Sequence, residues 1–251
     1  RRCISEGFEG FELYFQPIYN TDDDSLSGAE ALIRWNSRKY GFIGPNTFIP
    51  LLEDSALIIP LGRWIINTAA KACNRWITSI PDFVMHINLS FVQIVKSNIV
   101  KDVLENIERY SAANNHYVFE ITETIQMDQI PAVQNVFKEF VKNEFRFAID
   151  DFGTGYSNYG YMRDRTFDIV KVDRSFVTDI DKLKDNYLMV SFIIKMAHEM
   201  GLHVCIEGVE TKEELSCVKK LGADYIQGYY YGKPVCLQDF EEQHLKRFVL
   251  G

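Results

Sequence analysis

The chain has 251 residues, of which 47% are hydrophobic and 25% are charged, and its formal net charge is −8. These values lie near the averages of globular proteins and exclude disordered, collagen-like and disulfide-scaffold chains. The acidic balance disfavours binding to polymeric nucleic acid, because contacts with a phosphate backbone need a basic protein face.

The length fits one α/β domain of barrel size, since such barrels commonly reach about 250 residues. The sequence contains no linker, low-complexity tract or internal repeat, so we predict a single domain over residues 1–251. The chain begins with two arginines, and we interpret it as a domain excised from a longer protein with regulatory domains upstream.

The sequence gives no sign of membrane insertion or of a disulfide framework. Its best apolar run, 57–66, is interrupted by Pro60, Gly62 and Arg63 and is shorter than the roughly 20 residues of a membrane helix. The five cysteines are scattered and form no C-x-x-C pair. This pattern favours reduced thiols in a cytoplasmic protein over disulfides or a zinc site.

Short apolar or β-branched runs alternate with longer segments of helical period, which is typical of repeated βα units. The first two runs are separated only by the acidic loop 21–25, so we expect them to form an antiparallel hairpin. We interpret the aspartates of that loop as solvating the turn. The predicted strands are 11–18, 26–34, 83–89, 117–121, 145–150, 168–173, 203–207 and 224–227.

Three intervening helices have clear signals. An apolar stripe with helical spacing predicts the first, formed by Leu61, Ile65, Ala69, Ala72 and Trp76. Pro131 opens the helix 131–142 at a position where a missing N–H costs nothing. Thr211 and Glu214 form a capping box at the start of the helix 211–221, and Gly222 follows as its stop.

The later strands carry polar groups at their carboxyl ends. In a closed parallel barrel these ends meet on one face, where the active sites of such enzymes lie. One such residue would be an ordinary polar strand terminus, but six strands in succession indicate a site. The residues are Asn88, Glu120, Asp150 with Asp151, Lys171 with Asp173, Glu207 and Gln227.

Several carboxylates buried together are costly unless cations or protons neutralise them. Glu120, Asp150, Asp151 and Glu207 therefore predict a metal site. None of the five histidines ends a strand, so the expected ligands are carboxylate and amide oxygens, which suit Mg²⁺ or Mn²⁺ better than Zn²⁺ or Cu²⁺. We interpret His86, His203 and Cys205 as core residues below the mouth of the barrel.

Adjacent Asp150 and Asp151 would point to opposite sides of a continuing strand. They can serve one site only if the chain turns, and Gly153 and Gly155 in DFGTG predict such a turn.

Lys171 has two interpretations. It could position a metal-activated water, or it could form a Schiff base, although nearby carboxylates would raise its pKa and weaken the second interpretation.

Nine segments resemble, in order, the signature segments of EAL domains, which are bacterial phosphodiesterases that cut cyclic di-GMP to linear pGpG. Together they extend from Tyr14 to Pro234. The segments are YFQPI (14–18), EALIRW (30–35), FIPLLEDS (48–55), NLS (88–90), EITE (120–123), DDFGTGYS (150–157), KVDRSFV (171–177), EGVET (207–211) and QGYYYGKP (227–234).

The resemblance implies an α/β fold, a (β/α)₈ TIM-like barrel with an antiparallel early strand. It also implies two divalent cations, Mg²⁺ or Mn²⁺, with Ca²⁺ inhibitory, and hydrolysis by a metal-activated water. By this resemblance the metal ligands are Glu30, Asn88, Glu120, Asp150 and Asp151. Asp150 is the ligand that bridges the two metals. Lys171 corresponds to the lysine that contacts the attacking water, and Glu207 is either a base or a metal ligand.

The resemblance also implies a set of substrate-side positions, among which Arg34 is the obvious phosphate partner because its guanidinium matches two oxygens. These positions are Gln16, Leu32, Arg34, Pro50, Asp173, Glu210 and Gln227. Glu123, with Gly153, Thr154 and Gly155, is expected to support the loop after Asp151.

These residues are compatible with three functions. The complete ligand set favours an active phosphodiesterase. The alternatives are a catalytically silent cyclic di-GMP receptor or interaction module, and a metal-independent lyase that uses Lys171. By analogy with the family we also expect a homodimer, in which the segment 156–166 couples the subunits to the site.

Overall fold

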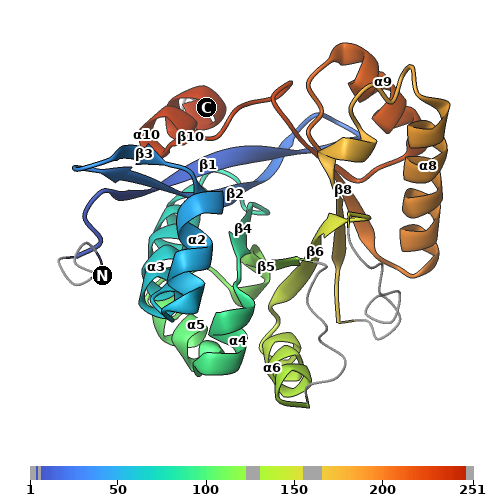
Figure 1. The fold of residues 1–251 in the computed structure, drawn as a ribbon. Helices are drawn as coiled ribbons and strands as arrows, with labels where there is room; N and C mark the ends of the chain where they lie inside the picture. The colour runs from blue at the N-terminus through green and yellow to red at the C-terminus, as the bar shows by residue number, and fades with distance from the viewer. Residues whose placement is uncertain (1–3, 5–6, 123–130, 155–165, 247–251) are drawn as a thin grey trace.

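The strand Phe11–Asn20 pairs with both Leu26–Ser37 and Tyr225–Gln227, so that the sheet closes into a barrel of eight strands (Figure 1). The computed structural model describes residue 4 and residues 7–122, 131–154 and 166–246. In barrel order the strands are β1 (Phe11–Asn20), β2 (Leu26–Ser37), β4 (Val84–Asn88), β5 (Tyr117–Thr122), β6 (Arg146–Phe152), β7 (Ile169–Val172), β8 (His203–Glu207) and β9 (Tyr225–Gln227).

Strand directions agree with the predicted fold class. β1 runs antiparallel to both of its barrel neighbours, β2 and β9. The other neighbouring pairs, from β2–β4 to β8–β9, are parallel. The α/β barrel with an antiparallel early strand is therefore confirmed, and all eight predicted strands are present with ends that differ by a few residues. Two short edge strands were not predicted: β3 (Gly41–Ile43), which pairs with β2, and β10 (Val235–Cys236), which pairs with β1.

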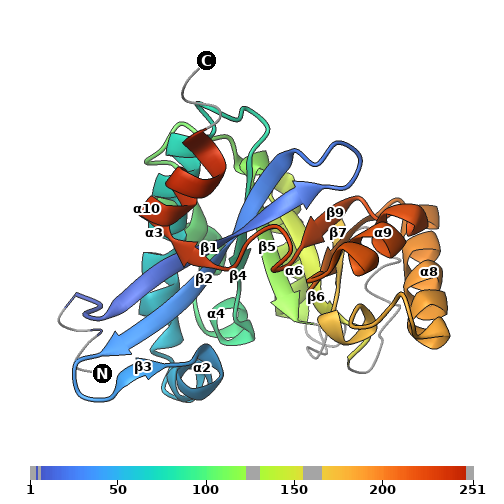
Figure 2. The same ribbon diagram turned by 90° about the horizontal axis from the view of Figure 1, so that it is seen from above.

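Helices cover the outside of the barrel, with α3 to α6 on one side and α8 and α9 on the other (Figures 1 and 2). They are α2 (Pro45–Asp54), α3 (Ile58–Trp76), α4 (Phe91–Lys96), α5 (Ile99–Ile107), α6 (Pro131–Lys142), α8 (Lys184–Glu199), α9 (Lys212–Leu221) and α10 (Leu237–Phe240). Short helical turns are η1 (Asn114–His116), η3 (Arg174–Phe176) and η4 (Glu241–Leu245). The predicted stripe of α3 is buried, and α9 has the predicted capping box at Thr211.

No helix follows β1, and α10 covers this part of the barrel instead. The Phe240 ring stacks on Trp76 of α3 with centroids 4.6 Å apart, and Trp76 in turn meets Phe15 of β1 at 4.9 Å. Figure 2 shows α10 lying beside α3. The end of the described chain thus supplies the apolar cover that a βα unit would otherwise give.

The barrel interior below the mouth is filled by a small apolar cluster. It consists of Ile18, Val118, Ala148, Ile169 and Cys205. The prediction of a core role for Cys205 is therefore confirmed.

The four cysteines within the described residues are free thiols, as predicted. Within the same part of the chain, no helix has the length and apolar character needed to cross a bilayer.

The interpretation of His203 as a core residue is wrong. His203 begins β8 at the rim opposite the mouth and is exposed. Its Nδ1 lies 3.2 Å from Asp224 Oδ1, while Asp224 Oδ2 accepts hydrogen bonds from Val204 N at 2.7 Å and from His198 Nε2 at 2.8 Å. Burial by itself raises the pKa of Asp224, but the hydrogen bonds from His203 and His198 lower it to about 2. The hydrogen bond to Asp224 raises the pKa of His203.

Replacing Asp224 by asparagine should destabilise the protein in a pH-dependent way. A carboxylate whose pKa is lowered in the folded protein stabilises the fold at pH values above its usual pKa of about 4. This contribution is lost as the pH falls through the pKa of the carboxylate in the folded protein. A histidine with a raised pKa contributes below about pH 6.5 and loses that contribution as the pH rises through its folded value. We expect a loss of about 1 kcal/mol, kept small by partial exposure and largest between about pH 4 and about pH 6.5. Urea unfolding of both proteins measures this loss; a pH-independent difference would contradict it.

Candidate metal centre and active site

Lys171 of β7 lies at the centre of the barrel mouth and is fully buried. Its ammonium group contacts four carboxylates that come from four other strands. The distances from Lys171 Nζ are 2.7 Å to Glu207, 2.8 Å to Glu120, 3.2 Å to Asp150 and 3.3 Å to Glu30. The structure therefore brings together Glu120, Asp150, Lys171 and Glu207, which were predicted from the strand ends, with Glu30, which lies within β2 and was predicted from the resemblance.

Two side-chain amides fix the position of Glu30. Asn88 Nδ2 donates to Glu30 Oε1 at 2.6 Å, and Gln227 Nε2 donates to Glu30 Oε2, also at 2.6 Å. Gln227 Nε2 also lies 3.1 Å from Gln16 Oε1, whose own amide donates to Gly232 O at 3.3 Å. Because Asn88 uses its Nδ2 on Glu30, its Oδ1 is the atom that remains for a cation.

His86 has a closer connection to the site than the sequence suggested. It is buried as predicted, but its Nδ1 lies 2.7 Å from Glu120 Oε1 and so orients that carboxylate. His86 precedes Asn88 by two residues on β4, so both side chains point to the same face. That shared face was the signal in the sequence for a contact with the site.

The chain turns at the end of β6 in a different way from the predicted one. Asp151 itself has a left-handed backbone with φ of 55°, and the pairing of β6 with β7 shifts register between Ile149 and Phe152. This bulge allows Asp150 and Asp151 to serve the same side. Their ligand oxygens and one of Glu207 lie within 4.8 Å of one another.

Gly153 contributes to the same turn, with φ of 96°. A Cβ at this position would lie 2.7 Å from the Phe176 ring, so only glycine fits between the loop and η3. Thr154 Oγ1 donates to Asp151 O at 2.8 Å and holds the first part of the loop. Gly155, Glu123 and the segment 156–165 lie outside the described residues.

The carboxylates have unequal proton affinities in the cation-free protein. Burial raises the pKa of Glu120 well above its usual value, with repulsion from Glu30 adding to it. Burial also raises the pKa of Glu207, to about 8, despite the attraction of Lys171. The pKa of Asp151 is raised by burial and by Asp150. Burial would raise the pKa of Glu30 too, but Lys171 and the two amides lower it to about 2.

Lys171 is held in its charged form. Burial alone lowers the pKa of Lys171, but the surrounding carboxylates, Asp150 and Glu120 first among them, raise it well above its usual value. A Schiff-base nucleophile needs a lysine with a lowered pKa. The electrostatics of the site therefore argue against the lyase interpretation.

The residues at the mouth fit divalent cations. One lysine faces more carboxylates than it can neutralise, and the raised pKa values of Glu120, Glu207 and Asp151 indicate an excess of negative charge. Asp150 Oδ1 is buried and, apart from its ion pair with Lys171 Nζ at 3.2 Å, has no hydrogen-bond partner within the described part of the chain. Carboxylate and amide oxygens are the ligands that suit Mg²⁺ and Mn²⁺.

A cavity of about 510 Å³ opens beside this cluster, between β2 and the helices α2 to α4. Leu32 and Arg34 line it together with Glu30, Asn88 and Asp150. The predicted substrate-side residue Pro50 is exposed on α2 and is not among the residues that line the cavity.

Two further predicted substrate positions lie on other loops of the mouth. Asp173 Oδ1 accepts a hydrogen bond from Ser175 N at 2.9 Å and caps η3. Glu210 precedes α9, is exposed, and donates its backbone N–H to Glu214 Oε2 at 2.9 Å.

Comparison with known proteins identifies the family. The model of the EAL domain matches residues 3–234. The chain is 32% identical over 228 residues to the cyclic di-GMP phosphodiesterase PdeL of Escherichia coli, covering 90% of this chain and 62% of PdeL. It covers only 28% to 47% of three other curated relatives, so it spans about half or less of their length.

Two solved structures share the fold closely. The EAL enzyme Bd1971, in a form bound to cAMP and cyclic di-GMP, has a TM-score of 0.88 at 34% identity, covering 96% of this chain and 68% of that chain. The PaMucR phosphodiesterase in complex with c-di-GMP also has a TM-score of 0.88, at 29% identity, with 95% and 97% coverage.

Proposed function

The chain belongs to the EAL domain family, and we propose that it hydrolyses cyclic di-GMP to linear pGpG with the help of two divalent cations, Mg²⁺ or Mn²⁺. The observation that carries this proposal is the convergence of Glu30, Glu120, Asp150 and Glu207 on Lys171 at the mouth of the barrel. The names of relatives such as PdeL and the cyclic di-GMP complexes of similar structures support the choice of substrate.

In this proposal Glu30, Asn88, Glu120 and Asp150 hold one cation, and Asp150 with Asp151 holds the other. Divalent cations bound there would activate a water molecule and stabilise the charge that develops on the phosphate. Ca²⁺ is expected to inhibit, because it takes more ligands at longer distances than Mg²⁺.

The protein's own groups have distinct tasks. Lys171, charged and buried, holds the attacking water and stabilises negative charge in a site of low dielectric constant. Glu207 serves either as the base or as a further ligand; its raised pKa lets it hold a proton near neutral pH before a cation enters. Thr154, through its hydrogen bond to Asp151 O, and Gly153 would support the position of Asp151, and the support expected from Glu123 and Gly155 stays a prediction.

The cavity beside the cluster would take the dinucleotide. Arg34 would pair with phosphate oxygens and Leu32 would contact a base, while Pro50, Asp173 and Glu210 would extend the contacts across the mouth. Gln16 and Gln227 would face the ligand from the β1 side. We also propose that the domain acts as a cytoplasmic homodimer, attached to regulatory domains of a longer protein.

The direct test is incubation of the purified chain with cyclic di-GMP and Mg²⁺, with and without EDTA, followed by chromatography of the products. We expect pGpG with Mg²⁺ and intact cyclic di-GMP with EDTA, because the carboxylate cluster needs cations to act on phosphate. Binding without any product would instead identify a receptor. Turnover that is insensitive to EDTA, with a borohydride-trapped adduct on Lys171, would identify a lyase.

A further inference from the structure

A buried histidine lies one layer below the carboxylate cluster. His86 of β4 is only 4% exposed, and its Nδ1 lies 2.7 Å from Glu120 Oε1. In the barrel it pairs with Glu30 of β2 and with Val118 of β5, and Val118 belongs to the apolar cluster that fills the interior. Burial of an imidazole among such neighbours is costly unless the ring is hydrogen-bonded, and Glu120 provides that partner.

The two oxygens of Glu120 have different partners. Oε1 meets His86, whereas Oε2 accepts a hydrogen bond from Lys171 Nζ at 2.8 Å. The other three carboxylates of the cluster also meet on Lys171. Oε2 is therefore the oxygen that Glu120 turns toward the cluster, and Oε1 is the oxygen that it turns toward the interior. The two contacts together fix the rotation of this carboxylate.

The rotation of a ligand carboxylate affects which cation the carboxylate suits. Ca²⁺ takes about six to eight oxygens and often binds both oxygens of one carboxylate, whereas Mg²⁺ needs near-octahedral geometry at shorter distances. A carboxylate that binds through both oxygens must turn both of them toward the cation. For Glu120, such a turn would break the contact with His86 and leave a buried imidazole without its partner, which is costly.

We propose that His86 is a positioning residue that selects the cation of the cluster. By holding Oε1, it leaves Glu120 a single oxygen for the ion and so favours Mg²⁺ over Ca²⁺. A carboxylate that binds a cation can only accept hydrogen bonds, so Nδ1 carries the imidazole hydrogen in the loaded site. The choice of this cluster as the metal site rests on the proposed function, whereas the selectivity is a property of binding and needs no turnover.

Calorimetric titration of the whole chain with Mg²⁺ and with Ca²⁺, in the absence of substrate, tests the selectivity. His86→Leu keeps much of the side-chain volume and removes the donor. We expect its affinity for Mg²⁺ to fall about tenfold or more, as for other hydrogen-bond partners of metal ligands. Its affinity for Ca²⁺ should stay the same or rise, because Glu120 is then free to bind through both oxygens.

His86→Asn is the rescue variant, because its Nδ2 can take the place of the imidazole Nδ1 and donate to Glu120. This variant should keep the preference of the unmodified chain for Mg²⁺. The matched control is His116→Leu. His116 Nδ1 lies 2.8 Å from the carbonyl of Phe83 at the opposite rim of the barrel, so its loss should leave both affinities unchanged.

A second measurement uses the unmodified chain and does not depend on how the variants fold. In protein with isotope-labelled histidine and saturating Mg²⁺, NMR spectroscopy should detect the hydrogen of His86 on Nδ1, in a hydrogen bond to a carboxylate. A hydrogen on Nε2 alone would overturn the proposal. Equal losses of Mg²⁺ and Ca²⁺ affinity in His86→Leu would also overturn it, because a general loss of structure weakens both.

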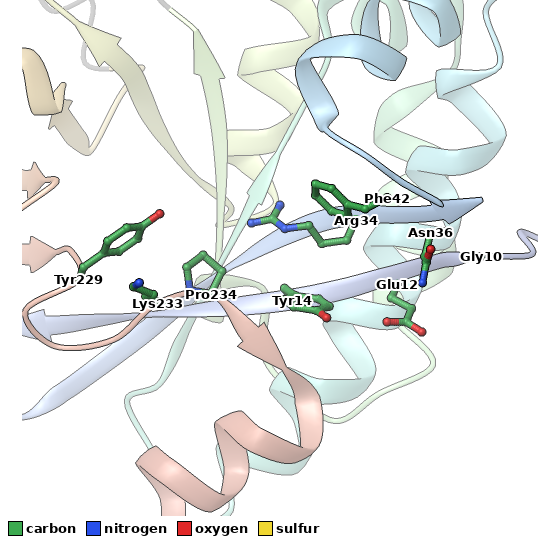
Figure 3. Close-up of a pocket in the computed structure, with 9 residues that line it drawn as sticks. All are labelled: Gly10, Glu12, Tyr14, Arg34, Asn36, Phe42, Tyr229, Lys233 and Pro234. Carbon is green, nitrogen blue, oxygen red and sulfur yellow. The ribbon is translucent and has the colours of Figure 1, made fainter. Parts of the chain in front are cut away.

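Turnover separates this proposal from the proposed function. Neither His86 nor Glu120 lines the pocket of about 360 Å³ around Arg34 (Figure 3), so His86→Leu should lower kcat at limiting Mg²⁺ without a comparable change in KM. Saturating Mg²⁺ should restore kcat. Failure of the proposed function would appear as no hydrolysis in any sample, with the shift in cation preference intact. Lost turnover with unchanged cation affinities would overturn the role of His86 in selecting the ion.

Discussion

Replacing Asp150 by alanine should abolish turnover of cyclic di-GMP at every Mg²⁺ concentration. Asp150 belongs to the oxygen group with Asp151 and Glu207, and its buried Oδ1 has no partner among the described residues other than the Lys171 ammonium group. In our proposal this carboxylate is shared between two cations, so no single water can replace it. We expect a loss of more than about 1,000-fold in kcat.

The same variant should bind fewer Mn²⁺ ions when titrated in the absence of substrate, which separates loss of metal from loss of chemistry. Asp185→Ala is the matched control, since it removes an exposed carboxylate at the start of α8 and should leave turnover and Mn²⁺ binding unchanged. Activity that returns to Asp150→Ala at high Mg²⁺ would refute the bridging role.

Replacing Lys171 by methionine should cause the second large effect, on stability as well as on activity. The ammonium group is the shared partner of four carboxylates that are otherwise placed close together in a buried site. Removing one partner from a buried ionic cluster leaves uncompensated charge, which costs about 3–5 kcal/mol. We expect that loss of unfolding free energy in EDTA, together with loss of turnover.

Chemical unfolding followed by circular dichroism measures the effect of Lys171→Met. The control is Lys219→Met, which breaks a surface pair with Asp24 at 2.7 Å and should cost less than about 1 kcal/mol. Equal stabilities of the two variants would show that Lys171 does not hold the carboxylates together. A Lys171→Met protein that retains turnover would remove the lysine from the mechanism.

Much of the barrel could be predicted because its signals are local. The apolar stripe of α3, the capping box at Thr211 and the short acidic loop before β2 each depend on neighbours in the sequence. The edge strands β3 and β10 could not be predicted, because each is stabilised by pairing with a longer strand elsewhere in the chain rather than by its own residues.

The residues of the site likewise divide into those that the sequence could predict and those that it could not. Strand ends and the parallel-barrel rule predicted which charged residues would meet, and the structure brings Glu120, Asp150 and Glu207 onto Lys171. The left-handed backbone at Asp151 could not be read from the sequence, since aspartate has only a weak preference for that conformation. His86 and His203 share similar sequence surroundings, but only pairing and depth in the barrel decide that one contacts Glu120 and the other the solvent.

The reversed direction of β1 determines where the polypeptide enters the barrel. Phe11, at the start of β1, pairs with Trp35 near the end of β2, so the chain arrives at the mouth and descends from there. It then presents Gln16 to Gln227, which donates in turn to Glu30. The antiparallel direction therefore places the start of β1 at the same rim as the carboxylate cluster and connects this strand to Glu30 through two side-chain amides. A first strand parallel to the others would begin at the opposite rim and end at the mouth.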